Sequence, residues 1–189
     1  MPSVTTETTL QRRVAGYHDI RLDGMLDLTI RAKGASVMDL GCNRGLVAFE
    51  MANNGARLVH GCDNYAPGIE TAKQLFADLR GVESQFEVVD LARGMPALKV
   101  FGGVRYDIVL MLATYHKLKR IMDPGILDAL MTGLGERTVK WFGWRATSDK
   151  PLENHEEMKV LDKQLAPLKR IHTSHISKTL GVAAIWERP

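Results

Sequence analysis

Two glycines in the first third of the chain are the first residues whose type and spacing indicate chemistry. Gly41 and Gly45 lie in a turn that follows the short apolar run 36–40 and precedes a helical pattern of apolar residues. A glycine lets the backbone turn sharply and lie against a ligand, because a Cβ would occupy the ligand's space. The helix behind such a turn directs free N–H groups and the positive end of its dipole toward the same place. The stretch therefore predicts a ligand-binding strand, turn and helix.

An acid at the end of the next predicted strand indicates what binds there. Residues 57–63 read as a second strand, and Asp63 closes it eighteen residues after Gly45. An acid at the tip of the neighbouring parallel strand is placed to accept hydrogen bonds from both hydroxyls of a ribose. We therefore expect a nucleoside site.

The spacing of the turn residues separates two kinds of nucleoside ligand. A dinucleotide fingerprint requires G-x-G-x-x-G, and the segment 41–45 (GCNRG) has neither that spacing nor the middle glycine. The segment 39–45 (DLGCNRG) instead resembles the first motif of the class I S-adenosylmethionine-dependent methyltransferases, D-x-G-x-G-x-G, with Asn43 in place of the middle glycine. The resemblance implies S-adenosylmethionine as cofactor and S-adenosylhomocysteine as product, and it favours these over a nicotinamide or flavin.

The resemblance covers nearly the whole chain and implies its fold. That fold is α/β, a three-layer Rossmann-like arrangement around a mostly parallel seven-stranded sheet with an antiparallel last strand. Leader helices within residues 1–35 would cover the cofactor, and residues 36–189 would form the binding core of a single domain. Arg13 and Tyr17 in the leader could reach the cofactor's carboxylate, or they could be a solvated arginine and a tyrosine that packs on the core. In the same family the third strand's end frames the adenine, so Asp90 would accept from the adenine amino group and Leu91 would lie beside the ring. A loop acid or helix cap is the alternative for Asp90.

The cofactor-binding residues expected are Asp39, Gly41, Cys42, Asn43, Gly45, Asp63, Asn64, Asp90, Leu91 and Leu112.

Candidate catalytic residues follow the apolar run 106–111, which reads as a buried parallel strand. Ligands in open α/β sheets bind outside the carboxyl ends of the strands, so residues 112–117 are nearest the chemistry. His116 could act as a general base near neutral pH, and Tyr115 could contact substrate or cofactor. The alternative is that His116 orients the following helix and Tyr115 is a wall of the pocket. Methyl transfer depends mainly on positioning, so no side chain need be essential.

The remaining composition narrows the class of protein. The chain has 189 residues, 45% hydrophobic and 25% charged, with a net charge of +3, which is typical of one globular domain. No apolar run is long enough to span a bilayer and no signal peptide is recognisable, so we expect a cytoplasmic protein without a membrane partner. The two cysteines, Cys42 and Cys62, predict neither a disulfide framework nor a metal site.

The acceptor is expected to be an oxygen or nitrogen atom of a small molecule, with RNA or a nucleotide second. The segment 112–115 (LATY) lacks the [DNS]-P-P-[YFW] motif of amino-adenine and cytosine N4 enzymes, and no Pro-Cys pair provides a cytosine C5 nucleophile. Lys117, Lys119 and Arg120 could attract a phosphate-bearing acceptor or could simply begin a solvated helix. A non-catalytic domain that binds S-adenosylmethionine beside a partner subunit is a further alternative.

Overall fold

The computed structural model describes residues 24–146, 150–175 and 181–189. The contacts expected of Arg13 and Tyr17, and most of the expected leader region, lie outside these residues. Within residues 24–35 the chain forms one short helix, α2 (Leu26–Ile30). Leu28 of this helix and Met25, which precedes it, are fully buried.

A single sheet organises the part of the chain that the structure describes, and it has the order β3-β2-β1-β4-β5-β7-β6. Strands β1 to β5 run parallel to one another, and β7 is antiparallel to both β5 and β6. This confirms the expected seven-stranded sheet with an antiparallel last strand. The strands are β1 (Ser36–Leu40), β2 (Leu58–Asp63), β3 (Glu83–Val88), β4 (Tyr106–Leu112), β5 (Thr138–Arg145), β6 (Lys169–His175) and β7 (Val182–Glu187).

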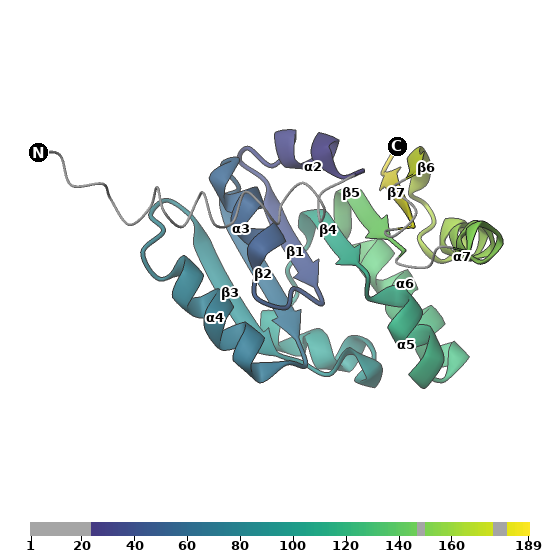
Figure 1. Ribbon diagram of the computed structural model, residues 1–189, viewed down its shortest axis with the longest axis horizontal. Helices are drawn as coiled ribbons and strands as arrows, with labels where there is room; N and C mark the ends of the chain where they lie inside the picture. Colours follow the sequence, from purple (N-terminus) through teal and green to yellow (C-terminus); the bar gives the residue numbers. More distant parts are fainter. Residues whose placement is uncertain (1–23, 147–149, 176–180) are drawn as a thin grey trace, which may run out of the picture.

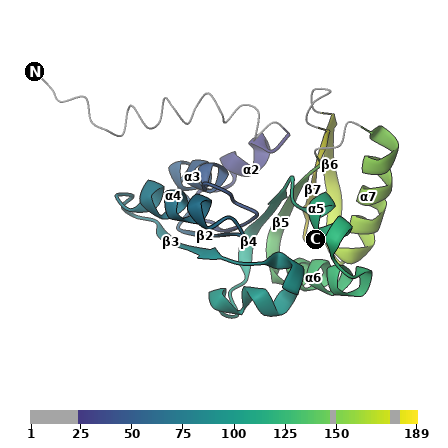
Figure 2. The ribbon, with the colours of Figure 1, turned by 60° about the horizontal axis from the view of Figure 1, so that its bottom comes forward.

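Helices cover both faces of the sheet and make three layers. One buried cluster joins the sheet to α2, α3 (Leu46–Asn53) and α4 (Ala66–Phe76). The other joins it to η1 (Leu91–Arg93), η2 (Met95–Phe101), α5 (Tyr115–Ile121), α6 (Pro124–Arg137) and α7 (Pro151–Gln164). Figures 1 and 2 show α3 and α4 together on one side of the strands, with α6 and α7 on the other. The expected three-layer architecture is therefore present.

The register of the two central strands is fixed by a polar contact at their amino ends. The backbone N–H and the hydroxyl of Ser36 both donate to Asp107 Oδ2, at 2.9 and 3.0 Å, and Lys140 Nζ lies 3.1 Å from Oδ1. Burial alone would raise the pKa of Asp107, but these hydrogen bonds and the Lys140 ammonium hold it below its usual value. The contact ties β1 to β4 and so sets which residues reach the carboxyl ends of both strands.

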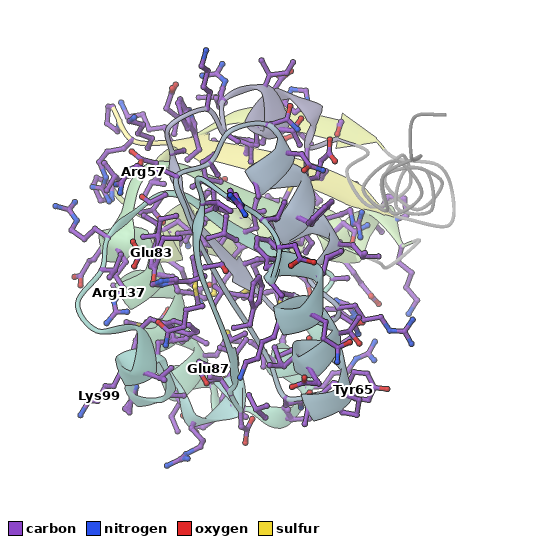
Figure 3. The ribbon with its side chains drawn as sticks, turned by 90° about the vertical axis from the view of Figure 1, so that its left-hand side faces the viewer. Arg57, Tyr65, Glu83, Glu87, Lys99 and Arg137 are labelled. Atoms are coloured by element: carbon purple, nitrogen blue, oxygen red, sulfur yellow. The ribbon has the colours of Figure 1, made fainter. Side chains whose placement is uncertain are left out.

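Strand β3 forms one edge of the sheet, and its charged side chains face outward. Figure 3 shows this edge, with Glu83 and Glu87 near its two ends and Tyr65 on the side of the carboxyl end. Charged residues on an edge strand disfavour pairing with another chain. The strand ends at Val88, so Asp90, which was expected at the end of the third strand, follows it in a connecting segment. Among the described helices, none is long and apolar enough to cross a membrane.

Candidate functional site

A cavity of about 490 Å³ opens at the carboxyl ends of the central strands. Its size falls within the range of small-molecule and cofactor sites. Nine of the ten expected cofactor residues line it: Asp39, Gly41, Cys42, Asn43, Asp63, Asn64, Asp90, Leu91 and Leu112. Residues predicted from separate motifs thus come together in one place.

Asp63 is held in a fixed orientation by two backbone donors. Asn43 N donates to Oδ2 and Tyr65 N donates to Oδ1, each at 2.9 Å. The first bond ties the end of β2 to the turn between β1 and α3, and the second closes the turn that precedes α4. A carboxylate has about four lone-pair sites, so both oxygens can still accept from a ligand. The geometry fits a pair of vicinal hydroxyls such as those of a ribose.

The turn after β1 requires left-handed backbone at two of its residues that line the cavity. Gly41 has φ +77°, and a Cβ there would collide with the Thr114 hydroxyl. Asn43 has φ +52°, a conformation that asparagine adopts more readily than most residues with a Cβ. Asn43 can therefore stand where the family motif has a glycine. Ala113, the residue that follows β4, has φ +57° and also lines the cavity.

Asp90 performs the capping role considered for it and also lines the cavity. Its Oδ1 accepts from Ala92 N at 3.0 Å, which begins η1, while its backbone stays extended. Leu91 beside it is buried. The capped acid and the apolar side chain lie at the same wall, which suits a planar heterocycle with an amino group.

Gly45 has a different neighbour from the one expected. It is absent from the cavity lining, and a Cβ on it would lie 2.8 Å from the Ala72 Cβ of α4. With φ +72° it is the residue that precedes α3. Its missing side chain therefore lets α3 approach α4.

Tyr115 and His116, the expected catalytic residues, do not line the cavity. The Tyr115 hydroxyl is directed to α7 and donates to Gln164 Oε1 at 3.3 Å, and burial raises the pKa of Tyr115 to about 12. His116 is half-buried, and burial together with Arg120 and Lys117 lowers its pKa. The side chains of α5 that do reach the cavity are Lys117, Leu118 and Ile121.

The cavity also has residues to which sequence reasoning gave no defined role. Thr114 lies next to the Gly41 turn, its hydroxyl within 3.3 Å of Leu40 O and 3.1 Å of Leu112 O. Arg145 ends β5, is only 6% exposed, and pairs in register with Leu112. The 3.6-residue period of a helix, counted from Thr114, would have indicated which side of α5 faces the cavity. Arg145 could have been found because ligands bind at the carboxyl ends of strands, where β5 ends.

The two cysteines are free and buried. Burial, with Asp39 next, raises the pKa of the Cys42 thiol above its usual range, and burial raises that of Cys62 to about 12. Both thiols therefore stay protonated near neutral pH and are poor nucleophiles. Cys42 contributes to the cavity wall by its shape.

Sheet order, flanking helices and a cavity at the strand ends define the class I S-adenosylmethionine-dependent methyltransferase fold, and the chain has this fold. No protein-family model matches it. It is 37% identical over 120 residues to a ubiquinone biosynthesis O-methyltransferase of Neisseria meningitidis, an alignment covering 58% of this chain and 44% of that enzyme. The chain thus matches less than half the length of that relative.

Solved structures show the same fold at low sequence identity. Magnesium protoporphyrin IX methyltransferase from Synechocystis PCC 6803, solved with bound S-adenosylmethionine, has a TM-score of 0.68 and 18% identity, over 100% of this chain and 86% of that one. The ribosomal protein L11 methylase of Lactobacillus delbrueckii subsp. bulgaricus has a TM-score of 0.59 and 16% identity, over 85% of this chain and 75% of that one.

Proposed function

We propose that the protein is an S-adenosylmethionine-dependent methyltransferase that methylates an oxygen or nitrogen atom of a small molecule. The observation that carries the proposal is the pairing of Asp63 with the Gly41 turn in one cavity, where Asn43 N orients the Asp63 carboxylate. The likeness to an enzyme named for O-methylation supports an oxygen acceptor. The occurrence of S-adenosylmethionine in a solved structure of the same fold supports the cofactor.

Each wall of the cavity has a role in this proposal. Asp63 accepts from the ribose hydroxyls, and Asp90 with Leu91 holds the adenine. Gly41 allows the backbone to pass close to the amino acid end of the cofactor, near buried Asp39. The cofactor, when bound, supplies a methyl group on a sulfonium that leaves as a neutral thioether.

The chain contributes to the transfer mainly by positioning. Holding the acceptor in line with the methyl group can supply roughly 7–11 kcal/mol of the barrier. Lys117, Leu118 and Ile121 on α5, with Thr114 before them, line the part of the cavity that follows β4. We assign this part to the acceptor.

Calorimetry with S-adenosylhomocysteine tests the cofactor site. Asp63→Ala should weaken binding by about 1.5–3 kcal/mol, or about ten- to a hundredfold, since it removes hydrogen bonds to a charged group. Asp78→Ala is the matched control, because Asp78 is an exposed acid outside the cavity lining. Equal affinities in a folded Asp63→Ala protein would refute the ribose assignment.

A second measurement tests catalysis itself. Labelled S-adenosylmethionine should transfer its methyl group to a fraction of a small-molecule extract. Tight S-adenosylhomocysteine binding without any labelled product would favour a non-catalytic binding domain, and label in an RNA fraction would favour a nucleic-acid acceptor.

A further inference from the structure

The cavity is divided by charge. Its acids, Asp39, Asp63 and Asp90, come from β1, from β2 and from the segment after β3. Its cations, Lys117 and Arg145, come from α5 and from the end of β5. Under the proposed function the adenosine and its sulfonium occupy the acidic side, so the basic side remains for the acceptor.

Arg145 is the buried cation of this basic side. Its backbone is fixed, because Arg145 pairs with Leu112 in the sheet and Arg145 O accepts from Ala113 N at 2.9 Å. The side chain is 6% exposed and lines the cavity. It already has interactions within the protein, and a guanidinium has five N–H donors in a planar fork that matches a carboxylate or a phosphate.

Lys117 is the exposed cation at the mouth of the cavity. Lys119, on the same helix, lies 3.3 Å from Glu157, whereas no carboxylate among the described residues forms an ion pair with Lys117. Leu118 and Ile121 flank it on the cavity side, and Ile121 is 69% exposed. An ammonium and an apolar surface therefore lie together on one face of α5.

We propose that the methyl acceptor is a small organic anion whose carboxylate or phosphate binds Arg145 and Lys117 and whose apolar part lies on Leu118 and Ile121. The inference rests on the proposed function and names the substrate class of that site. A long nucleic acid fits less well, because its affinity depends on many phosphate contacts, and the basic side of this cavity has two cations of which one is buried.

The test uses protein saturated with S-adenosylhomocysteine and three probes of similar shape: benzoate, phenyl phosphate and neutral benzamide. Calorimetry should show at least one anion binding about tenfold or more tightly than benzamide, which is the difference in affinity expected from one hydrogen bond to a charged group. Arg145→Gln should remove most of this preference. Lys117→Gln should weaken the anion about two- to fivefold, as expected for an exposed charge. The matched control is Arg120→Gln, because Arg120 is an exposed cation of the same helix that does not line the cavity.

Four results would overturn the proposal. The first is equal affinity for the anions and benzamide. The second is an equal effect of Lys117→Gln and Arg120→Gln, and the third is tighter binding of a short single-stranded RNA, measured as a further probe, than of either anion. The fourth is a loss of S-adenosylhomocysteine affinity in Arg145→Gln with benzoate binding unchanged, which would assign Arg145 to the cofactor. Failure of S-adenosylhomocysteine to bind the unmodified protein would instead refute the proposed function, so the two failures are distinguishable.

Discussion

At the scale of single residues, the backbone conformation of Asn43 is coupled to the orientation of Asp63. Asn43 has φ +52° and its N–H donates to Asp63 Oδ2. Asn43→Gly keeps this conformation available, so we expect S-adenosylhomocysteine affinity within about threefold of the unmodified protein. Asn43→Val should cost about 1–2 kcal/mol in the left-handed region and misdirect the N–H, weakening binding at least about fivefold.

Calorimetry with S-adenosylhomocysteine on the two Asn43 variants checks this expectation. Urea unfolding of the same proteins separates a local change from loss of the fold. Equal affinity of the valine and glycine variants would mean that the turn conformation does not orient the acid.

The catalytic hypothesis for Tyr115 and His116 can also be tested at this scale. Neither side chain lines the cavity, and the Tyr115 hydroxyl instead contacts Gln164 of α7. We therefore expect His116→Ala and Tyr115→Phe to lower the turnover number by less than about threefold, well short of the 10²–10⁴-fold effect of a lost general base. Turnover with labelled S-adenosylmethionine and the acceptor found by screening is the measurement. A loss of a hundredfold in His116→Ala would restore the assignment of a base.

At the scale of elements, Gly45 determines how closely α3 packs against α4. A Cβ at Gly45 would lie 2.8 Å from the Ala72 Cβ, and φ is +72°. Gly45→Ala should therefore lower the free energy of unfolding by about 1–3 kcal/mol, through backbone strain and overpacking together.

Gly34 offers a matched control for the strain alone. It has φ +71°, and a Cβ there would meet nothing within 4 Å. Urea unfolding should show Gly34→Ala to be less destabilising than Gly45→Ala. Adding Ala72→Gly should recover part of the loss in Gly45→Ala and none in Gly34→Ala. Equal destabilisation by the two alanines, without recovery, would show that α4 does not limit this position.

The strands and helices were largely predictable from the sequence, but the contacts between packed elements were not. Apolar runs and turn residues located β1, β2 and β4 to within a residue or two, because buried parallel strands have near-continuous apolar sequence. The contact of Gly45 with Ala72 depends on how α3 packs on α4, and the apolar period of a sequence does not report that packing. The end of β3 was not predictable either: the sequence indicates Asp90 as the strand's last residue, but the strand ends at Val88.

Within the site, residues were predictable where one backbone feature defines the ligand contact. Gly41, Asn43 and Asp63 belong to such features, and all three line the cavity. Tyr115 and His116 follow a strand end directly, yet α5 turns them away from the cavity and presents Lys117 and Ile121 instead. Proximity in sequence to a strand end therefore located one wall of the cavity but not the side chains that line it.

At the scale of the whole molecule, stability should depend on pH through a buried histidine that does not line the cavity. His60 on β2 is 6% exposed, its Nδ1 lies 2.8 Å from the Tyr106 hydroxyl, and its ring stacks on Phe101. Burial lowers the pKa of His60, and Glu83 opposes this by favouring the charged form. Arg137 faces the same pair, and its charge opposes the rise that burial causes in the pKa of Tyr106. Figure 3 shows Glu83 and Arg137 on the same side of the molecule.

The sign of the effect follows from this lowered pKa. Below about pH 6.5 the unfolded chain binds a proton on this histidine while the folded protein resists it, so the free energy of unfolding falls as the pH falls. The slope is at most about 1.4 kcal/mol per pH unit for each such group. The pKa of His116 is lowered as well, by burial and then by Arg120 and Lys117, so the two contributions add.

Urea unfolding between about pH 8 and pH 5 should therefore show a plateau above about pH 7 and a decline below it. His60→Gln, whose amide oxygen can still accept from Tyr106, should flatten part of that decline, and His116→Gln should flatten a separate part. If His60→Gln and the unmodified protein lost stability in parallel over this range, the proton uptake would have to come from histidines other than His60.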